Sequence, residues 1–353
     1  MNPLQTNVYK GLTLSKPRTK IQLPHINLEI GLKMPNDLDS SDYLSDLSEK
    51  DKPWDIHRAN TGKVEKLYKS AKYERYAERL HHCSNILEFD LRTDEVGSVV
   101  FKLKSAKFCR VRFCPTCQWR RTMKWQAKMF QALPKITEAY PTHRWLFLTL
   151  TVKNCHMYDL RQTIADMNKS FTRLSQLKIF PAIGWIKNIE VTRNPETNQA
   201  HPHMHVMLLV PSSYFSGQKY IKHDQWRSLW QKSARLDYLP QVNIQAIKNK
   251  NKSDEESDIK KEVLEMFKYS VKEEDLIHSE DWLLALTTQL HKTRSIGIGG
   301  VLREFLKEES ETDDLINIDE TDQDSEEIPE ELMKLYFGWR ERVEKYQRIT
   351  DSN

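Results

Sequence analysis

Three histidines stand at alternate positions in the stretch His201-Pro202-His203-Met204-His205, directly before the apolar run 206–210. Side chains of an extended strand alternate between its two faces, so the three imidazoles share one face while Met204 points into the core. Neutral imidazole is the commonest metal ligand in proteins. The spacing therefore predicts a metal site on a rigid strand, although a fortuitous histidine cluster would have the same spacing.

Glu190 is the carboxylate expected beside these histidines. Strand-like residues 183–193 precede the turn residues 194–198, which predicts a hairpin with the histidine strand. The turn lies about midway between Glu190 and His203, so the register can bring the carboxylate close to His203 and His205. Two imidazoles and one carboxylate suit Mn²⁺ or Mg²⁺, which polarise a phosphate. His201 competes for the third position, and an ordinary solvated strand carboxylate is the other interpretation of Glu190.

A helix is predicted over residues 259–272, and it contains a tyrosine that could act as a nucleophile. Glu265 and Tyr269 are four residues apart and would share one helix face, with Lys272 one turn beyond. A tyrosine hydroxyl, with a pKa of about 10, needs help to attack a phosphodiester at neutral pH. A metal and Lys272 could supply that help, and Glu265 could activate water to release the resulting phosphotyrosine. A tyrosine that only packs is the alternative.

Four of the five cysteines lie close together in the sequence: Cys83, Cys109, Cys114 and Cys117. The turn 114–117 places two thiolates on one knuckle, and the other two thiolates would complete a closed, tetrahedral zinc site. An odd number of cysteines suits metal binding better than a disulfide framework. A set of buried, unreactive thiols is the alternative.

Basic and aromatic side chains interleave on a helix predicted to follow the cysteines and to end near residue 133. They are Trp119, Arg120, Arg121, Lys124 and Trp125. Such residues can bind phosphates and stack on bases, although a solvated helix face can have the same composition. Residues 101–175 carry fifteen Lys or Arg against three acids, whereas residues 308–331 carry thirteen acids and no Lys or Arg. This segregation predicts a nucleic-acid-binding body with a solvated acidic segment.

The chain is expected to divide into five parts. Residues 1–52 are polar and without periodicity, which predicts a disordered arm, and residues 53–143 form a helical, cysteine-rich zinc and DNA-binding module. Residues 144–307 form the domain with the histidines and Tyr269. An acidic linker over 308–329 and a charged helix over 330–353 follow.

Strands and helices of the histidine domain follow the order βαββαβ. The strands are expected at 145–152, 183–193, 201–210 and 241–247, and the helices at 158–177 and 223–234. This order is typical of a ferredoxin-like antiparallel sheet in the α+β class, with helices on one face and the other face open to nucleic acid. Beyond the tyrosine helix we expect a helix at 281–291, a flexible break at 297–300 and a short helix at 301–308.

Membrane insertion and export find no support in the sequence. No stretch approaches the roughly 20 apolar residues of a membrane span, and the N-terminus lacks the apolar core of a signal peptide. The 353 residues, of which 39% are hydrophobic, can fill the core of one large or two modest domains. We therefore expect a soluble, cytoplasmic protein.

Taken together, the motifs resemble those of the replication initiators (Rep proteins) of small rolling-circle plasmids. These belong to the endonuclease superfamily named for a His-hydrophobe-His motif. Three motifs carry the resemblance in chain order: 147–151 (FLTLT), 201–205 (HPHMH) and 268–272 (KYSVK). The block 114–121 (CPTCQWRR) is similar as well.

The resemblance implies roles for individual residues. Tyr269 would be the nicking tyrosine, Glu265 the carboxylate that activates water, and His203 and His205 the metal ligands. The implied enzyme is a metal-dependent, site-specific single-strand endonuclease and strand transferase. It would bind the plasmid origin, form a 5′-phosphotyrosine adduct, free a 3′ hydroxyl as a primer, and finish by strand joining or release.

Partners and rival functions follow from the same residues. The expected partners are single-stranded or hairpin origin DNA, a host helicase and a DNA polymerase, with a dimer on the origin as one form of assembly. A mobilisation relaxase or transposase would use the same chemistry. A zinc-containing DNA-binding regulator without catalysis would need only the zinc module. An RNA-cleaving module would depend on the 2′ hydroxyl of its substrate.

Overall fold

The computed structural model describes residues 42–93, 99–247, 255–306, 315 and 334–349. Its N-terminal helices are α1 (Leu44–Leu47), η2 (Glu49–Asp51), α2 (Pro53–Ser70) and α3 (Glu74–His81), followed by strands β1 (Ile86–Thr93) and β2 (Val99–Ala106) and helix α4 (Pro115–Ala139). The central elements are β3 (His143–Thr151), η3 (Met157–Asp159), α5 (Leu160–Ser175), β4 (Gly184–Arg193), β5 (Ala200–Pro211), η4 (Ser212–Phe215), η5 (Gly217–Lys219), α6 (His223–Ala234) and β6 (Val242–Ala246). The last are α7 (Glu255–Met266), α8 (Glu273–Leu276), α9 (Glu280–Gln289), β7 (Ile296–Gly300), α10 (Leu302–Phe305), β8 (Lys334–Arg340) and β9 (Lys345–Ile349).

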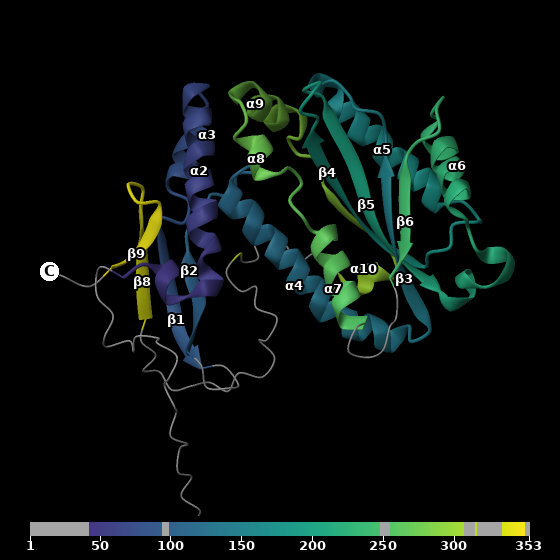
Figure 1. Cartoon of the computed structure of the whole chain (residues 1–353), viewed down its shortest axis with the longest axis horizontal. Helices are drawn as coiled ribbons and strands as arrows, with labels where there is room; N and C mark the ends of the chain where they lie inside the picture. Colours follow the sequence, from purple (N-terminus) through teal and green to yellow (C-terminus); the bar gives the residue numbers. More distant parts are fainter. Residues whose placement is uncertain (1–41, 94–98, 248–254, 307–314, 316–333, 350–353) are drawn as a thin grey trace, which may run out of the picture.

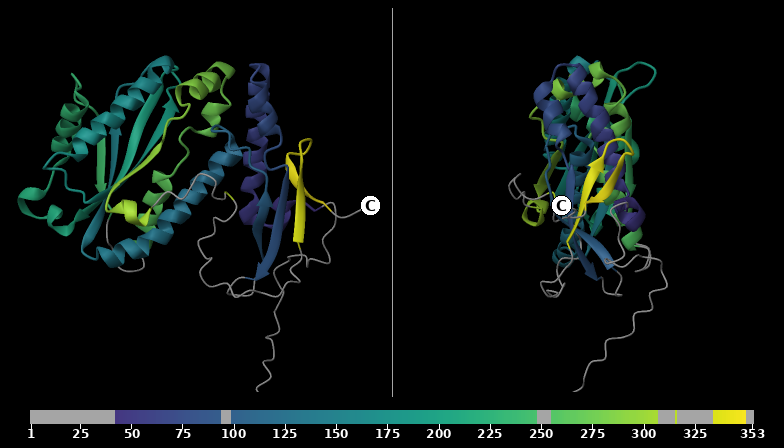
Figure 2. Two further views of the ribbon diagram at one scale, coloured as in Figure 1. Left: turned by 180° about the vertical axis from the view of Figure 1, so that it is seen from behind. Right: turned by 90° about the vertical axis from the view of Figure 1, so that its left-hand side faces the viewer.

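Two antiparallel sheets organise these elements, as expected for the α+β class. One has the strand order β2-β1-β8-β9, and the other has the order β6-β3-β5-β4-β7. Figure 1 shows α2 and α3 beside the smaller sheet and the long helix α4 running between the two sheets, an arrangement that the reverse view in Figure 2 repeats. No helix of the described residues is long and apolar enough to cross a membrane.

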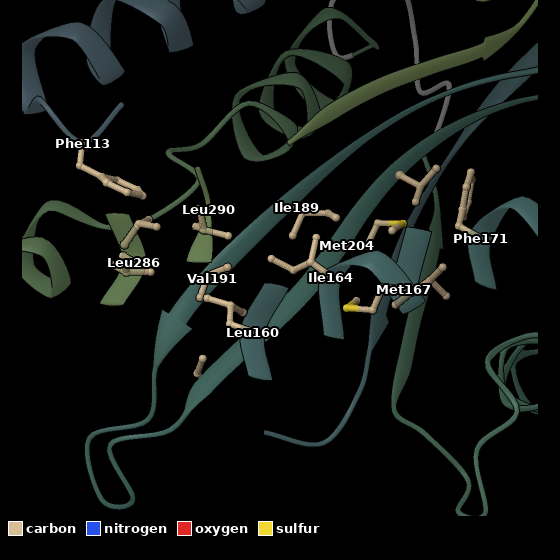
Figure 3. Close-up of a cluster of buried hydrophobic side chains, with 14 of the residues drawn as sticks. Phe113, Leu160, Ile164, Met167, Phe171, Ile189, Val191, Met204, Leu286 and Leu290 are labelled. Carbon is tan, nitrogen blue, oxygen red and sulfur yellow. The ribbon is translucent and has the colours of Figure 1, made fainter. Parts of the chain in front are cut away.

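Helix α5 covers one face of the five-stranded sheet. Its apolar residues Leu160, Ile164 and Met167 recur at helical spacing and meet Ile189 and Met204 of the sheet (Figure 3). Trp226 and Trp230 of α6 are fully buried in the same cluster. Burial of this face fixes the register of the strands, because a slip by one residue would turn the apolar side chains away from the core.

The opposite face of this sheet is not open, contrary to the expectation from the sequence. Phe147, Met207 and Leu209 are buried there under α4, α7 and α10. Helices therefore cover both faces, and the physical reason is visible in the near-continuous apolar runs of β3 and β5, which are typical of strands that are buried on both sides. Only the end of this face that carries His203 and His205 remains for chemistry.

The C-terminal residues form a β-hairpin, so the predicted helix over 330–353 is wrong for residues 334–349. Leu335 and Phe337 are buried at alternate positions, and β8 pairs with β1, Leu87 lying opposite Phe337. The apolar pattern of residues 334–340 is too short to distinguish a helix from a strand. Pairing with the edge of β1 stabilises the strand. The chain therefore returns from the second sheet to complete the first.

Ordered structure begins earlier than the sequence suggested. Leu44 is fully buried, Tyr43 makes a β-bridge to Gln347, and the amide of Arg348 donates to the carbonyl of Asp42. The part of the predicted disordered arm from 42 to 52 is thus packed against the C-terminal hairpin, while the part over 1–41 lies outside the described residues. The predicted acidic linker also lies outside them, apart from Leu315, which is buried.

Residues 297–300, predicted as a flexible break, belong to the edge strand β7 (Ile296–Gly300). A Cβ on Gly299 would lie 2.1 Å from the Trp185 ring, and Gly300 has a φ of +60°. The glycines are therefore needed for the close approach of β7 to β4 and not for flexibility. Pairing of Gly297 with Lys187 extends the sheet on the β4 side.

Candidate functional site

Glu190, His203 and His205 form one compact group at the end of the five-stranded sheet. The hairpin register pairs Glu190 of β4 with His203 of β5, as the turn position predicted. The Nε2 atoms of His203 and His205 lie 3.0 and 3.2 Å from the same Glu190 carboxylate oxygen. The three side chains could together hold a metal ion.

The second ring nitrogen of each histidine also has an oxygen partner. His203 Nδ1 lies 3.3 Å from the carbonyl of His201, and His205 Nδ1 lies 3.2 Å from the hydroxyl of Thr149. An N–H on each Nδ1 would leave both Nε2 atoms free to bind a metal, which is the usual arrangement around metal-bound histidine. Octahedral ligands at about 2.1 Å from Mg²⁺ stand about 3.0 Å apart, so the observed spacings fit such an ion.

Electrostatics favour an ionised Glu190. Burial raises the pKa of this carboxyl, but hydrogen bonds from His203 and His205 and the charges of the two rings outweigh burial and hold the pKa well below its usual range. The Glu190 carboxylate therefore carries a negative charge beside the two imidazoles at neutral pH.

His201 lies apart from this group. Its Nδ1 is 2.6 Å from the side-chain oxygen of Asn154. Burial lowers the pKa of His201, the charge of His203 lowers it further, and Glu190 opposes both. The structure thus groups Glu190, and not His201, with His203 and His205.

Tyr269 lies in the segment between α7 and α8, and not on a helix as predicted. Helix α7 ends at Met266, and the following backbone is attached to β4 on both sides of Glu190. Asn188 Nδ2 donates to the carbonyl of Met266 at 3.0 Å, and the amide of Val191 donates to the carbonyl of Ser270 at 2.8 Å. These hydrogen bonds to β4 end helix α7 early, and no local sequence pattern predicts them.

The Tyr269 hydroxyl faces a histidine that sequence reasoning missed. Its oxygen lies 3.4 Å from Nε2 of His57 on α2, and His57 Nδ1 lies 2.6 Å from a carboxylate oxygen of Glu273 on α8. Burial raises the pKa of Tyr269, and the charge of Glu273 raises it further. Neither His57 nor Glu273 belongs to a motif, because their role depends on contacts across more than 200 positions of sequence.

Glu265 and Lys272, predicted on one face with Tyr269, are separated from it by the end of α7. Glu265 forms an ion pair with Lys268 in the last turn of the helix. Lys272 is exposed and precedes α8 as its N-cap. Lys268, and not Lys272, lines the same cavity as Tyr269.

A cavity of about 420 Å³ opens beside Tyr269. Among the residues that the structure describes, its lining includes seven cationic side chains and no acid: Arg110, Arg112, Arg121, Lys124, Lys128, Lys268 and Arg294. Burial, together with the charges of the neighbouring Arg121 and Arg161, lowers the pKa of Arg112 to about 10. Crowded positive charge of this kind favours binding of a polyanion such as a nucleic-acid backbone.

The residues expected on one DNA-contacting face of α4 fall into two sets. Arg121, Lys124 and Trp125 line the basic cavity. Trp119 and Arg120 are buried instead, and Arg120 Nε donates to the carbonyl of Leu315 at 2.9 Å. Helical periodicity places residues 121, 124, 125 and 128 on one face, with Trp119 on the opposite side of the helix and Arg120 at the edge of that face.

The four predicted cysteines meet in one cluster between α3, β2 and α4. Three pairs of sulfurs, 83–117, 109–117 and 83–114, lie 3.6 Å apart, too far for disulfides. Four thiolates around zinc at about 2.3 Å stand about 3.8 Å apart, so the cluster could hold a zinc ion. Backbone amides of Cys109 and Arg110 point at the sulfurs of Cys83 and Cys117, at 3.4 and 3.3 Å.

Comparison with known proteins places the chain among replication proteins. A family model described as "Replication protein" matches residues 100–347. A "Protein rep" of Streptococcus pneumoniae serotype 2 (strain D39 / NCTC 7466) is 35% identical over 264 residues, which cover 73% of this chain and 80% of that protein. A "Protein rep" of Bacillus amyloliquefaciens is 35% identical over 305 residues, covering 80% of this chain and 88% of that protein.

A shorter relative agrees with these. A "Replication protein" of Staphylococcus aureus is 36% identical over 239 residues, which cover 64% of this chain and 98% of that protein. No solved structure matches the chain significantly. The motifs, the extent of the family match and the identity over most of the chain agree: the chain belongs to the replication protein (Rep) family.

Proposed function

We propose that this protein initiates rolling-circle replication of a plasmid by nicking one strand of the origin with Tyr269. The observation that carries the proposal is the attachment of the Tyr269 segment to β4 on both sides of Glu190, beside a cavity lined by cations. A nucleophile, a candidate metal group and a site for a DNA strand thereby share one end of the sheet.

The protein's own residues supply binding and orientation. Arg121, Lys124 and Trp125 bind the phosphates and bases of a single strand, and Lys268 lies near the phosphate that Tyr269 attacks, in the role first given to Lys272. Glu190, His203 and His205 hold Mn²⁺ or Mg²⁺, which when bound polarises the phosphate. The attack forms a bond between tyrosine and the 5′ phosphate and frees a 3′ hydroxyl.

Glu265 keeps its proposed role in the last step. Its ion-pair partner Lys268 lines the cavity, whereas Glu265 lies behind that lysine, and a shift of the carboxylate into the cavity would let it activate water or a second hydroxyl. Strand joining or release then ends the cycle.

The finer features of the fold belong to the same proposal. The elements β3, α5, β4, β5, α6 and β6, with the strand order β6-β3-β5-β4, are those of a ferredoxin-like sheet to which β7 adds an edge. We assign residues 53–143 to a zinc and DNA-binding module and residues 144–307 to the nicking domain. Origin DNA, a host helicase and a DNA polymerase are the partners, and the cytoplasm is the compartment.

One incubation tests the proposal. Purified protein, a labelled single-stranded origin oligonucleotide and Mn²⁺ should give a covalent adduct that EDTA prevents, and mapping the modified peptide should identify Tyr269. Tyr269→Phe should bind the oligonucleotide with unchanged affinity and form no adduct. Adduct formation by Tyr269→Phe, or origin binding without cleavage under any divalent ion, would reject the assigned chemistry. Glu265→Gln should nick normally and release slowly.

A further inference from the structure

His57 occupies a position between Tyr269 and Glu273 that the mechanism above leaves unused. Its Nε2 lies 3.4 Å from the Tyr269 hydroxyl and its Nδ1 lies 2.6 Å from the Glu273 carboxylate. The three residues come from α2, from the segment after α7 and from α8. A hydroxyl, an imidazole and a carboxylate in a row form the arrangement that activates nucleophiles in many hydrolases.

Packing fixes the orientation of the imidazole. The His57 ring stacks on Trp119, with centroids 4.7 Å apart and planes at 27°. Asn60, one turn further along α2, donates to the second Glu273 oxygen at 2.7 Å. The side chains of His57 and Glu273 are only 13% and 11% exposed, so the pair is held in a largely dry environment.

The carboxylate also decides which nitrogen carries the proton. Glu273 can only accept at this distance, so His57 Nδ1 must donate to it, and the Nε2 of the neutral ring is left with its lone pair toward Tyr269. The Tyr269 O–H can donate a hydrogen bond to this lone pair. The titratable groups shown to face His57 are Glu273 and Tyr269, while α4 presents the neutral Trp119 to it.

We infer that His57 is the general base for Tyr269 and that Glu273 is its positioning residue; the inference rests on the proposed nicking function. In the step, the O–H bond of Tyr269 breaks and its proton moves to His57 Nε2. The freed electron pair forms the new O–P bond as the bond from phosphorus to the 3′ oxygen breaks. The 3′ oxygen takes a proton from water, and the imidazolium returns its own to water.

Two further observations support this assignment. The pKa of Tyr269 is raised by burial and by Glu273, so its hydroxyl keeps the proton at neutral pH and needs a base. The base that the geometry supplies is His57, which Glu273 contacts directly on the side away from Tyr269.

Single-turnover nicking of an origin oligonucleotide by the full chain tests the inference. His57→Ala and His57→Gln should lower the rate by about 100-fold or more at pH 7. The deficit should shrink as the pH rises, because hydroxide then replaces the base, and added imidazole should restore part of the His57→Ala rate. Glu273→Gln should also lower the rate. Added imidazole should not restore this rate, because the His57 side chain still occupies the space that imidazole would need.

Controls separate this inference from the function on which it rests. His81→Ala changes an exposed histidine that bonds to Glu65, and it should leave the rate and its pH dependence unchanged. If Tyr269→Phe still nicks, the proposed function fails. If Tyr269→Phe is inactive while folded His57→Ala or His57→Gln nicks at the wild-type rate, faster, or with the wild-type pH dependence, the function stands and the role of His57 is refuted.

Discussion

Replacing Cys114 by serine is the sharpest test of the cysteine cluster. The Sγ–Sγ distances of 3.6 Å around Cys83 and Cys117 correspond to a metal–sulfur distance of about 2.2 Å in a tetrahedron, close to the usual zinc value. The cluster joins the end of α3, the end of β2 and the start of α4. Zinc should therefore hold together three segments that carry the first sheet and its helix.

The expected loss of stability follows from binding linkage. A ligand present at about a thousand times its dissociation constant stabilises the folded state by about 4 kcal/mol. At roughly 1–2 °C per kcal/mol for a chain of 353 residues, Cys114→Ser should melt roughly 4–8 °C below the wild-type protein. A chelator should lower the wild-type melting temperature by a similar amount and leave Cys114→Ser almost unchanged.

Elemental analysis and thiol titration measure the site directly. Wild-type protein should contain one zinc per chain and expose one reactive thiol, that of Cys155, until chelation or unfolding exposes the other four. Cys155 is half-buried and lies outside the cluster, so Cys155→Ser is the matched control and should keep its zinc. Equal zinc content in Cys114→Ser and the wild type, or a wild-type protein purified without chelator that holds no zinc, would refute the site.

Two stability predictions test other parts of the fold by denaturant titration. Burial lowers the pKa of Lys187 to about 8, whereas the unfolded side chain keeps its proton up to about pH 10.4. Lys187→Met should therefore raise the free energy of unfolding by up to about 3 kcal/mol at pH 7, and the gain should vanish as the pH rises from 8 toward 10. A gain independent of pH would exclude charge burial as its cause. The fully buried Tyr346 hydroxyl bonds to the carbonyl and hydroxyl oxygens of Ser84 at 2.7 and 3.0 Å, so Tyr346→Phe should cost about 1–3 kcal/mol. A change below about 0.5 kcal/mol would show that this anchor of the C-terminal hairpin contributes little.

The position of Tyr269 links the two halves of the molecule. Its backbone is attached to β4 of the larger sheet, whereas its hydroxyl faces His57 of the N-terminal helix α2. A change in the packing of these halves would therefore alter the environment of the tyrosine.

The sequence by itself determined the parts of the site that depend on local geometry. Strand alternation placed His203 and His205 on one face, and the position of the turn brought Glu190 opposite His203. The close spacing of Cys114 and Cys117 on one knuckle limited their geometry in the same way. These predictions depend on the two-residue period of a strand and on short loops, both of which are encoded within a few residues.

Only the tertiary structure decided what surrounds Tyr269 and where the chain ends pack. His57 is 212 residues from Tyr269, and no periodicity relates residues so far apart. The chain leaves the helix after Met266 because Asn188 and Val191 of β4 donate to the carbonyls of Met266 and Ser270, and β8 is a strand because β1 offers it an edge. Short apolar patterns fit a helix or a strand equally well, and distant hydrogen-bond partners and buried surface select one of them.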